Sequence, residues 1–208
     1  MKTVFIFGLG YVGVPLAQAL ADQGWQVRGT TRTPSKLADK AGQGWQILPF
    51  QSGQPLADPA AAFADIDAII STITAIGGSD PVLDAHGGDL ANFSGWSGYV
   101  SATSVYPDMP HDICYEDTEV APATARGKAR VIAEAHWQEA FGTEIFRAAG
   151  IYGVGRSPFD ALRDGTARII ERDGQVFNRI HVDDICRIII AAMAKPRSGR
   201  IINLADYK

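Results

Sequence analysis

Cysteine is scarce in this chain, with Cys114 and Cys186 as the only two. Both are flanked by apolar or helical sequence, and neither stands at a spacing that suits a metal site. Few cysteines without such spacing are typical of proteins from a reducing compartment. We therefore expect a cytoplasmic protein with no metal site, in which both cysteines are chemically inert.

Long apolar runs and an excess of positive charge are also missing. The apolar run at the N-terminus is cut by glycines after seven residues, unlike a signal peptide, and no stretch is long enough to span a membrane. A formal net charge of −4 gives no general attraction to nucleic acid or to an anionic membrane. We expect neither as a partner. The 208 residues, 46% of them hydrophobic, suit one domain over residues 1–208.

The most informative glycines of the chain are Gly8, Gly10 and Gly13. These three form a GxGxxG pattern that follows an apolar strand-like run, residues 3–7, and opens a predicted helix over 12–23. The first glycine allows a tight turn, the second lets the backbone approach a pyrophosphate, and the third lets the helix pack on the strand. The pattern predicts a dinucleotide-binding loop.

Apolar, β-branched runs alternate with helical patterns along the rest of the chain. This alternation, together with the glycine loop, predicts an α/β fold with a doubly wound parallel sheet, the NAD(P)-binding Rossmann fold. Strands are expected at 25–31, 45–50, 68–73, 98–101, 144–147, 175–181 and 200–204, and helices from 34, at 59–63, from 81 to about 93, at 123–141, 160–165 and 184–194.

The end of the second strand carries Thr31 and Arg32 where NAD enzymes place an acidic residue against the ribose hydroxyl. An arginine fork and a hydroxyl favour a 2′-phosphate, so we expect NADP in preference to NAD. The alternative is that Arg32 is a solvated surface charge. The expected cofactor-binding residues are Gly8, Gly10, Tyr11, Val12, Gly13, Thr31, Arg32, Ser71 and Thr72.

Five segments in order resemble the extended and atypical short-chain dehydrogenase/reductase superfamily, which contains nucleoside-diphosphate-sugar epimerases and dehydratases. They are the glycine loop and residues 99–106 (YVSATSVY), 147–156 (RAAGIYGVGR), 178–184 (NRIHVDD) and 201–204 (IINL). The resemblance runs over nearly the whole chain, and it implies that residues 150–208 add a minimal C-terminal substrate lobe. It implies a nicotinamide cofactor and a catalytic set of serine or threonine, tyrosine and lysine.

This chain departs from that catalytic set at all three positions. Ala102 stands at the serine position, with Thr103 as a neighbouring hydroxyl, and Arg126 and Arg130 stand at the tyrosine and lysine positions. Arginine does not deprotonate in proteins, so Arg126 cannot act as a general base. The resemblance to an atypical subgroup implies an aspartate beyond the fourth strand, for which we assign Asp80, with Asp84 as the alternative. Asp80 and Thr103 are therefore the catalytic candidates.

Several basic residues are candidates for holding a small, anionic substrate or ligand. Arg126 and Arg130 lie one helical turn apart and share a face, whereas Lys128 is expected on a different face. The alternative for Arg130 is a surface ion pair with Glu134, four residues on. The full set of substrate candidates is Arg126, Arg130, Tyr152, Arg156 and Arg179.

The histidines carry no predicted catalytic role. We expect His181 and the following acidic residues to be structural, with Asp183 as a helix N-cap. His86 and His111 are assigned to loop or helix surfaces, and His136 is expected to be a packing or surface residue of the long helix.

Two functions remain open from the sequence. The first is an NADP-binding protein of the atypical short-chain dehydrogenase type with weak redox activity. The alternative is a non-catalytic module that senses NADP(H) or binds a partner. The sequence ends soon after the last strand, which predicts a more open substrate pocket than in sugar-nucleotide epimerases.

Overall fold

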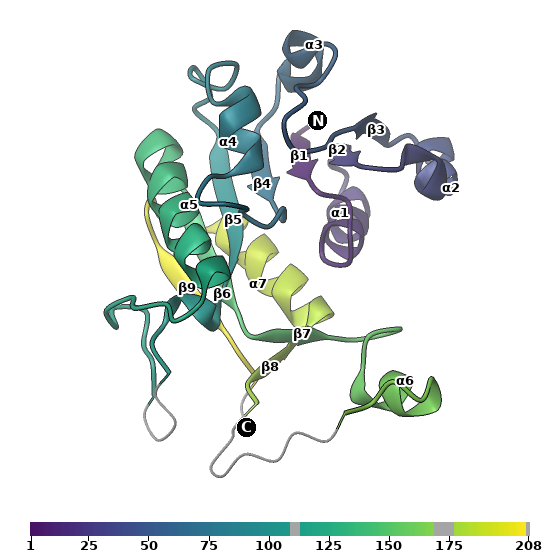
Figure 1. The fold of residues 1–208 in the computed structure, drawn as a ribbon. Helices are drawn as coiled ribbons and strands as arrows, with labels where there is room; N and C mark the ends of the chain where they lie inside the picture. Colours follow the sequence, from purple (N-terminus) through teal and green to yellow (C-terminus); the bar gives the residue numbers. More distant parts are fainter. Residues whose placement is uncertain (109–112, 169–176, 207–208) are drawn as a thin grey trace.

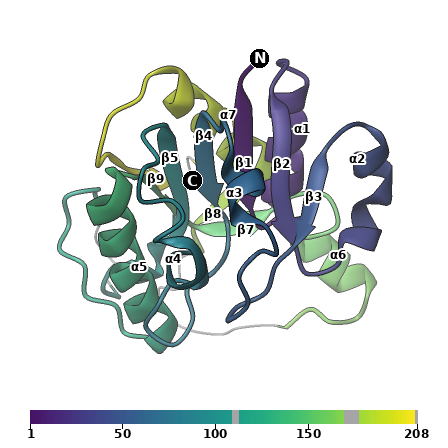
Figure 2. The ribbon, with the colours of Figure 1, turned by 90° about the horizontal axis from the view of Figure 1, so that it is seen from above.

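The main sheet has seven parallel strands in the order β3-β2-β1-β4-β5-β6-β9 (Figures 1 and 2). The computed structural model describes residues 1–108, 113–168 and 177–206. The strands of this sheet are β1 (Thr3–Phe7), β2 (Gln26–Thr31), β3 (Gln46–Pro49), β4 (Ala68–Ser71), β5 (Trp96–Ala102), β6 (Glu144–Ala148) and β9 (Ile201–Leu204). The predicted α/β class is confirmed.

Helices cover both faces of the sheet, as the buried strands require. The α-helices are α1 (Gly13–Ala21), α2 (Ala38–Gly42), α3 (Pro59–Phe63), α4 (Pro81–His86), α5 (Ala125–Phe141), α6 (Pro158–Arg163) and α7 (Val182–Ala194), and the 3-10 helices are η1 (Pro34–Leu37) and η2 (Thr103–Val105). None of the helices in the described part of the chain has the length and apolarity that crossing a membrane demands.

The alternation along β1 shows why both faces are apolar. All five residues of this strand are buried. Val4 and Ile6 join the core beneath α1 and α7, whereas Phe5 and Phe7 join the core beneath α4 and α5. A strand whose two faces are both apolar can lie only between two helical layers, and β1 accordingly lies inside the sheet, between β2 and β4.

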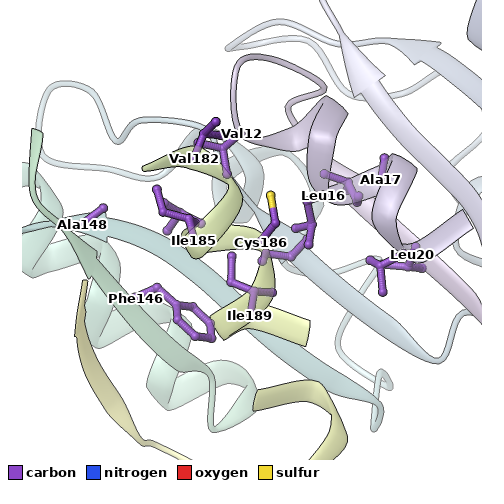
Figure 3. Close-up of a cluster of buried hydrophobic side chains, with 14 of the residues drawn as sticks. Val12, Leu16, Ala17, Leu20, Phe146, Ala148, Val182, Ile185, Cys186 and Ile189 are labelled. Atoms are coloured by element: carbon purple, nitrogen blue, oxygen red, sulfur yellow. The ribbon is translucent and has the colours of Figure 1, made fainter. Parts of the chain in front are cut away.

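The first helical layer is held together by α1 and α7. Figure 3 shows Leu16 and Leu20 of α1 facing Ile185 and Ile189 of α7, above Phe146 of β6. Cys186 lies in the same cluster, and burial raises the pKa of its thiol to about 12. Its protonated, buried state agrees with an inert side chain.

Part of the stretch expected to form the C-terminal lobe belongs to the main layers instead. Helix α7 packs in the core, and β9 is the edge strand beside β6. Outside these layers lie α6 and a small parallel pair, β7 (Gly150–Tyr152) and β8 (Arg179–His181), in the lower part of Figure 1. The sequence did not predict β7, because its glycine-rich segment resembles a loop.

Two local expectations need correction, and two further ones fall on residues outside the described part of the chain. Helix α4 ends at His86 rather than near residue 93, since Gly87 and Gly88 follow. His86 is buried among aromatic rings, where its Nε2 accepts a hydrogen bond from the backbone N–H of Leu56 at 3.1 Å, so it is not a surface residue. His111 and the first residues of the predicted strand 175–181 lie outside the described residues.

Candidate functional site

The loop between β1 and α1 is shaped by its glycines. Gly8 has φ +96°, and a Cβ there would lie 2.7 Å from Thr72 Oγ1. A Cβ on Gly13 would lie 2.1 Å from the carbonyl oxygen of Gly8, so only glycine fits at either position. A Cβ on Gly10, in contrast, would meet nothing within 4 Å. Gly8 and Gly13 are therefore required by the fold, while Gly10 leaves bare backbone facing open space.

Two threonines fix this loop from neighbouring strands. Thr30 Oγ1 accepts a hydrogen bond from the Gly8 N–H at 3.0 Å, and Thr72 Oγ1 donates to the Gly8 carbonyl at 2.7 Å. Thr72 thus supports the loop without lining the cleft beside it, and Ser71 is fully buried at the end of β4.

Tyr11 and Val12 belong to the glycine loop, but neither of them lines the cleft beside it. Val12 packs against Val182 and Ile185 in the first core (Figure 3). The hydroxyl of Tyr11 donates to the carbonyl of Val154 at 3.2 Å. Of the nine expected cofactor residues, Gly8, Gly10, Thr31 and Arg32 line the cleft.

The first cleft has a volume of about 730 Å³ and lies where the strand order reverses around β1. Its walls are the glycine loop, the end of β2, residues 50–52 and the loop after β4. In open parallel sheets, ligands bind at this switch point, beyond the carboxyl ends of the strands. Arg32 is the one charged side chain among the described residues that line this cleft.

A second cleft, of about 900 Å³, adjoins the first, and Thr74 and Ile76 line both. Arg126 and Arg130 of α5 line it, as does Arg156 from the loop after β7. Three of the five predicted substrate residues are therefore brought together. Lys128 lines this cleft as well, which corrects the expectation that it faces elsewhere.

Arg130 reaches inward from α5 toward the sheet. Its guanidinium donates to the carbonyl of Val100 at 3.3 Å and to Thr74 Oγ1 at 3.4 Å, while its Nε is buried without a partner. The expected surface pair with Glu134 is wrong. Glu134 is buried and forms an ion pair with Arg147 at 2.8 Å, because α5 turns that side chain into the protein.

Asp80 is a buried helix cap. Its Oδ1 accepts hydrogen bonds from the backbone N–H groups of Val82 at 3.0 Å and Leu83 at 3.2 Å. Burial raises the pKa of this carboxyl, against the lowering effects of those hydrogen bonds and of the nearby Trp137 indole, whose geometry falls short of a hydrogen bond. Asp80 lines neither cleft, so the geometry argues against its predicted catalytic role.

Thr103, the other catalytic candidate, begins η2 directly after β5, is half-buried and, like Asp80, lines neither cleft. Helix α5 is held close to this turn, since a Cβ on Gly127 would lie 2.3 Å from the carbonyl oxygen of Ser104. Thr103 therefore lies at the carboxyl edge of the sheet, beside the start of α5.

The two remaining substrate candidates lie on the small sheet and line neither cleft. Tyr152 and Arg179 come from β7 and β8, and a hydrogen bond with Asp206 raises the pKa of the Tyr152 hydroxyl. The N-cap of α7 is His181, whose Nδ1 accepts from the Asp183 N–H at 3.2 Å. The expectation that Asp183 caps this helix is wrong, because the helix begins one residue before it.

The sequence interpretation missed much of the two walls. Phe50, Gln51 and Ser52 enter the first cleft from the loop after β3, and Gly77 and Gly78 enter the second from the loop after β4. Position after a parallel strand was the available signal, since those loops share the carboxyl edge. Among the described residues, no group of three or more His, Cys, Asp or Glu side chains is arranged to hold a metal ion.

A glycine loop between the central strand and its helix, with an open cleft at the switch point, defines a dinucleotide-binding Rossmann domain. The bare backbone at Gly10 gives a pyrophosphate room to approach. A family model described as the NAD binding domain of 6-phosphogluconate dehydrogenase matches residues 3–119.

Similar proteins support this class over the whole chain. Protein YeeZ of Escherichia coli (strain K12) is 31% identical over 217 residues, covering 98% of this chain and 77% of YeeZ. A functionally unknown conserved protein from Silicibacter pomeroyi has 37% identity and a TM-score of 0.89, over 100% of this chain and 73% of that one. The dTDP-glucose 4,6-dehydratase of Bacillus anthracis, solved in complex with NAD, shares the fold at 14% identity, with a TM-score of 0.75 and coverage of 100% and 76%.

The chain belongs to the family of the NAD binding domain of 6-phosphogluconate dehydrogenase. It has an NAD-binding domain of the Rossmann type, a fold that it shares with a dTDP-glucose 4,6-dehydratase and a UDP-N-acetylglucosamine 4-epimerase. The predicted fold and nicotinamide cofactor are confirmed at this level.

Proposed function

We propose that this chain binds NADP(H) in the first cleft and belongs to the atypical short-chain dehydrogenases, with a degenerate catalytic set. The observation that carries the preference for NADP is Arg32, which lines the cleft beside Thr31 and the glycine loop with no acidic neighbour among the described lining residues. An arginine fork matches a 2′-phosphate in charge and geometry, whereas a ribose hydroxyl would pair better with a carboxylate.

The chain's own residues define what chemistry is open to it. When bound, the cofactor supplies hydride exchange at C4 of its nicotinamide. Arg126 and Arg130 stay protonated, and buried Asp80 is engaged as a cap, so none of them exchanges a proton with a substrate hydroxyl. Thr103 lines neither cleft, but it is half-buried at the carboxyl edge of the sheet, unlike the fully buried, capping Asp80, so we assign it proton transfer in any residual redox reaction.

A non-catalytic, NADP(H)-sensing module is the second candidate function. It is favoured by the same observation that weakens catalysis, namely a buried Asp80 and arginines at the expected tyrosine and lysine positions. Both functions require the cofactor.

Cofactor preference is tested by titrating the protein with NADPH and NADH and following the fluorescence of the reduced nicotinamide. We expect NADPH to bind more tightly. The Arg32→Ala variant removes a charge-assisted phosphate contact of about 1.5–3 kcal/mol, so the preference should shrink about tenfold or more.

The matched control is Lys36→Ala. Lys36 is an exposed cation just beyond β2 that does not line the cleft, so this variant should keep the preference of the unaltered protein. Equal affinity of the unaltered protein for NADPH and NADH would overturn the proposed preference.

A further inference from the structure

The second cleft is a strongly basic compartment. Four of its lining residues are cationic, Arg126, Lys128, Arg130 and Arg156, and none of the described lining residues is acidic. The formal charge of the whole chain is −4, so this concentration of positive charge is local. A cleft lined by charge of one sign raises the local concentration of ligands of the opposite sign.

Among the described residues, these four cations lack the carboxylate partner that several other arginines of the chain have. Arg147, Arg163, Arg187 and Arg200 each form an ion pair with a carboxylate. Within the described ranges 1–108, 113–168 and 177–206, no ion pair is formed by Arg126, Lys128, Arg130 or Arg156. Such cations are available to a ligand.

Their placement favours more than one contact with that ligand. Arg126 and Arg130 are one turn apart on α5, where like charges repel unless an anion lies between them. The guanidinium of Arg156 is held 5.3 Å from the centre of the Tyr11 ring, so it approaches the cleft from a different element. Arg130 adds a buried Nε with no partner.

The cleft also has an apolar side. Ile76 and Ile132 line it and keep 62% and 38% of their surface exposed. Its volume of about 900 Å³ falls within the range of small-molecule pockets. Positive groups on separate elements, with apolar surface beside them, suit a short carbon skeleton that carries separated anionic groups.

We propose that the second cleft binds a small molecule with at least two anionic groups, phosphate or carboxylate. Arg126 and Arg130, one turn apart, hold one group and Arg156 the other, while Lys128 adds positive charge to the same cleft. This inference depends on the proposed function in one respect, namely that NADP(H) occupies the first cleft.

The experiment is calorimetric titration of the full chain with NADPH present at saturation, which occupies the glycine loop. The probes are inorganic pyrophosphate and succinate, and inorganic phosphate and acetate are their single-group counterparts. We expect at least one two-group probe to bind about tenfold or more tightly than its counterpart, and whichever pair shows this identifies phosphate or carboxylate as the preferred chemistry.

Two variants test whether the probe binds in the second cleft. Arg126→Ala and Lys128→Ala change exposed side chains, and each should weaken the bound probe about tenfold or more. Arg187→Ala, an exposed arginine on α7 that lines neither cleft, is the matched control and should leave its affinity unchanged. NADPH fluorescence of both cleft variants should match the unaltered protein.

Three results would overturn the inference. They are no binding of either two-group probe, unchanged affinity in both cleft variants, and displacement of NADPH by the probe, which would place the anion at the glycine loop. A protein that binds no NADPH fails the proposed function. In that case the same probe and variants still test the second cleft, because loss of binding in Arg126→Ala places the anion there.

Discussion

At the scale of single residues, identity and environment give different information. Asp80 has the chemistry of a general acid and stands beyond β4, yet its carboxyl caps α4 and is fully buried. The nearby Tyr99 hydroxyl is also buried without a partner, and its pKa is raised by burial and by the charge of Asp80. Burial thus assigns Asp80 to stability rather than to proton exchange with a ligand.

Asp80 should make the stability of the protein depend on pH. Because its folded-state pKa is raised, the protonated carboxyl stabilises the fold, fully below the ordinary value of 3.8, and this contribution is lost as pH rises through the folded-state pKa. Asparagine keeps a capping oxygen but does not titrate. We therefore expect the free energy of unfolding of Asp80→Asn, relative to the unaltered protein, to increase between acidic and neutral pH.

Urea unfolding across that pH range measures this difference. Asp58→Asn is the matched control, since Asp58 caps α3 from an exposed position. Parallel stability profiles for Asp80→Asn and the unaltered protein would contradict the prediction. The Asp80→Ala variant, which loses the cap as well, should cost about 0.5–2 kcal/mol.

At the scale of elements, α5 serves both the core and the second cleft. Its start presents basic residues to the cleft, and Ala129, Ala133 and Trp137 are buried against the sheet. Glu134 shares this buried side and accepts from the Arg147 guanidinium, which also donates to the Tyr106 hydroxyl at 2.8 Å. This pair joins α5 to β6 and fixes how the helix presents its first turn.

Breaking that pair should be costly. Glu134→Gln leaves Arg147 charged and buried without its carboxylate, and removal of one partner of a buried ion pair costs about 3–5 kcal/mol. Urea unfolding should show this loss. Glu139→Gln, on the exposed side of the same helix, should stay within about 0.5 kcal/mol of the unaltered protein. Similar values for the two variants would show that the buried pair does not stabilise α5.

At the scale of the whole molecule, two clefts meet at one edge of the sheet. The first carries the glycine loop and Arg32, and the second carries the basic residues of α5. The shared loop after β4 places any ligand of the second cleft next to a ligand of the first. Under the proposed function, Arg126 and Arg130 stand at the positions that the resemblance gives to a catalytic tyrosine and lysine.

Turnover distinguishes the catalytic function from the sensing function. With UDP- or dTDP-sugars and cofactor, we expect no turnover that depends on a phenolic base, since Arg126 stands at the tyrosine position. Any residual activity should fall about 10²-fold or more in Thr103→Val, which removes a hydroxyl at constant shape. The loss of activity is measured by comparing the pH–rate profiles of the unaltered protein and of the Thr103→Val variant. Robust activity that survives Thr103→Val would show that another group transfers the proton.

The sequence by itself determined the layers and the cofactor loop. Two-sided apolar strands such as β1 and glycines that no side chain can replace, Gly8 and Gly13, are local signals, because each follows from neighbouring residues and backbone geometry. Thr31 and Arg32 were found in the same way, from their place at the end of a strand.

Only the tertiary structure decided which charges lie together. Glu134 pairs with Arg147 rather than with Arg130, Lys128 joins the second cleft, and Asp80 is buried. Each outcome depends on residues far apart in the chain, and helical spacing alone does not show which side of α5 faces the sheet. The partners of a charge, and hence its role, are set by the packing of distant elements, because burial and electrostatic interactions act through space.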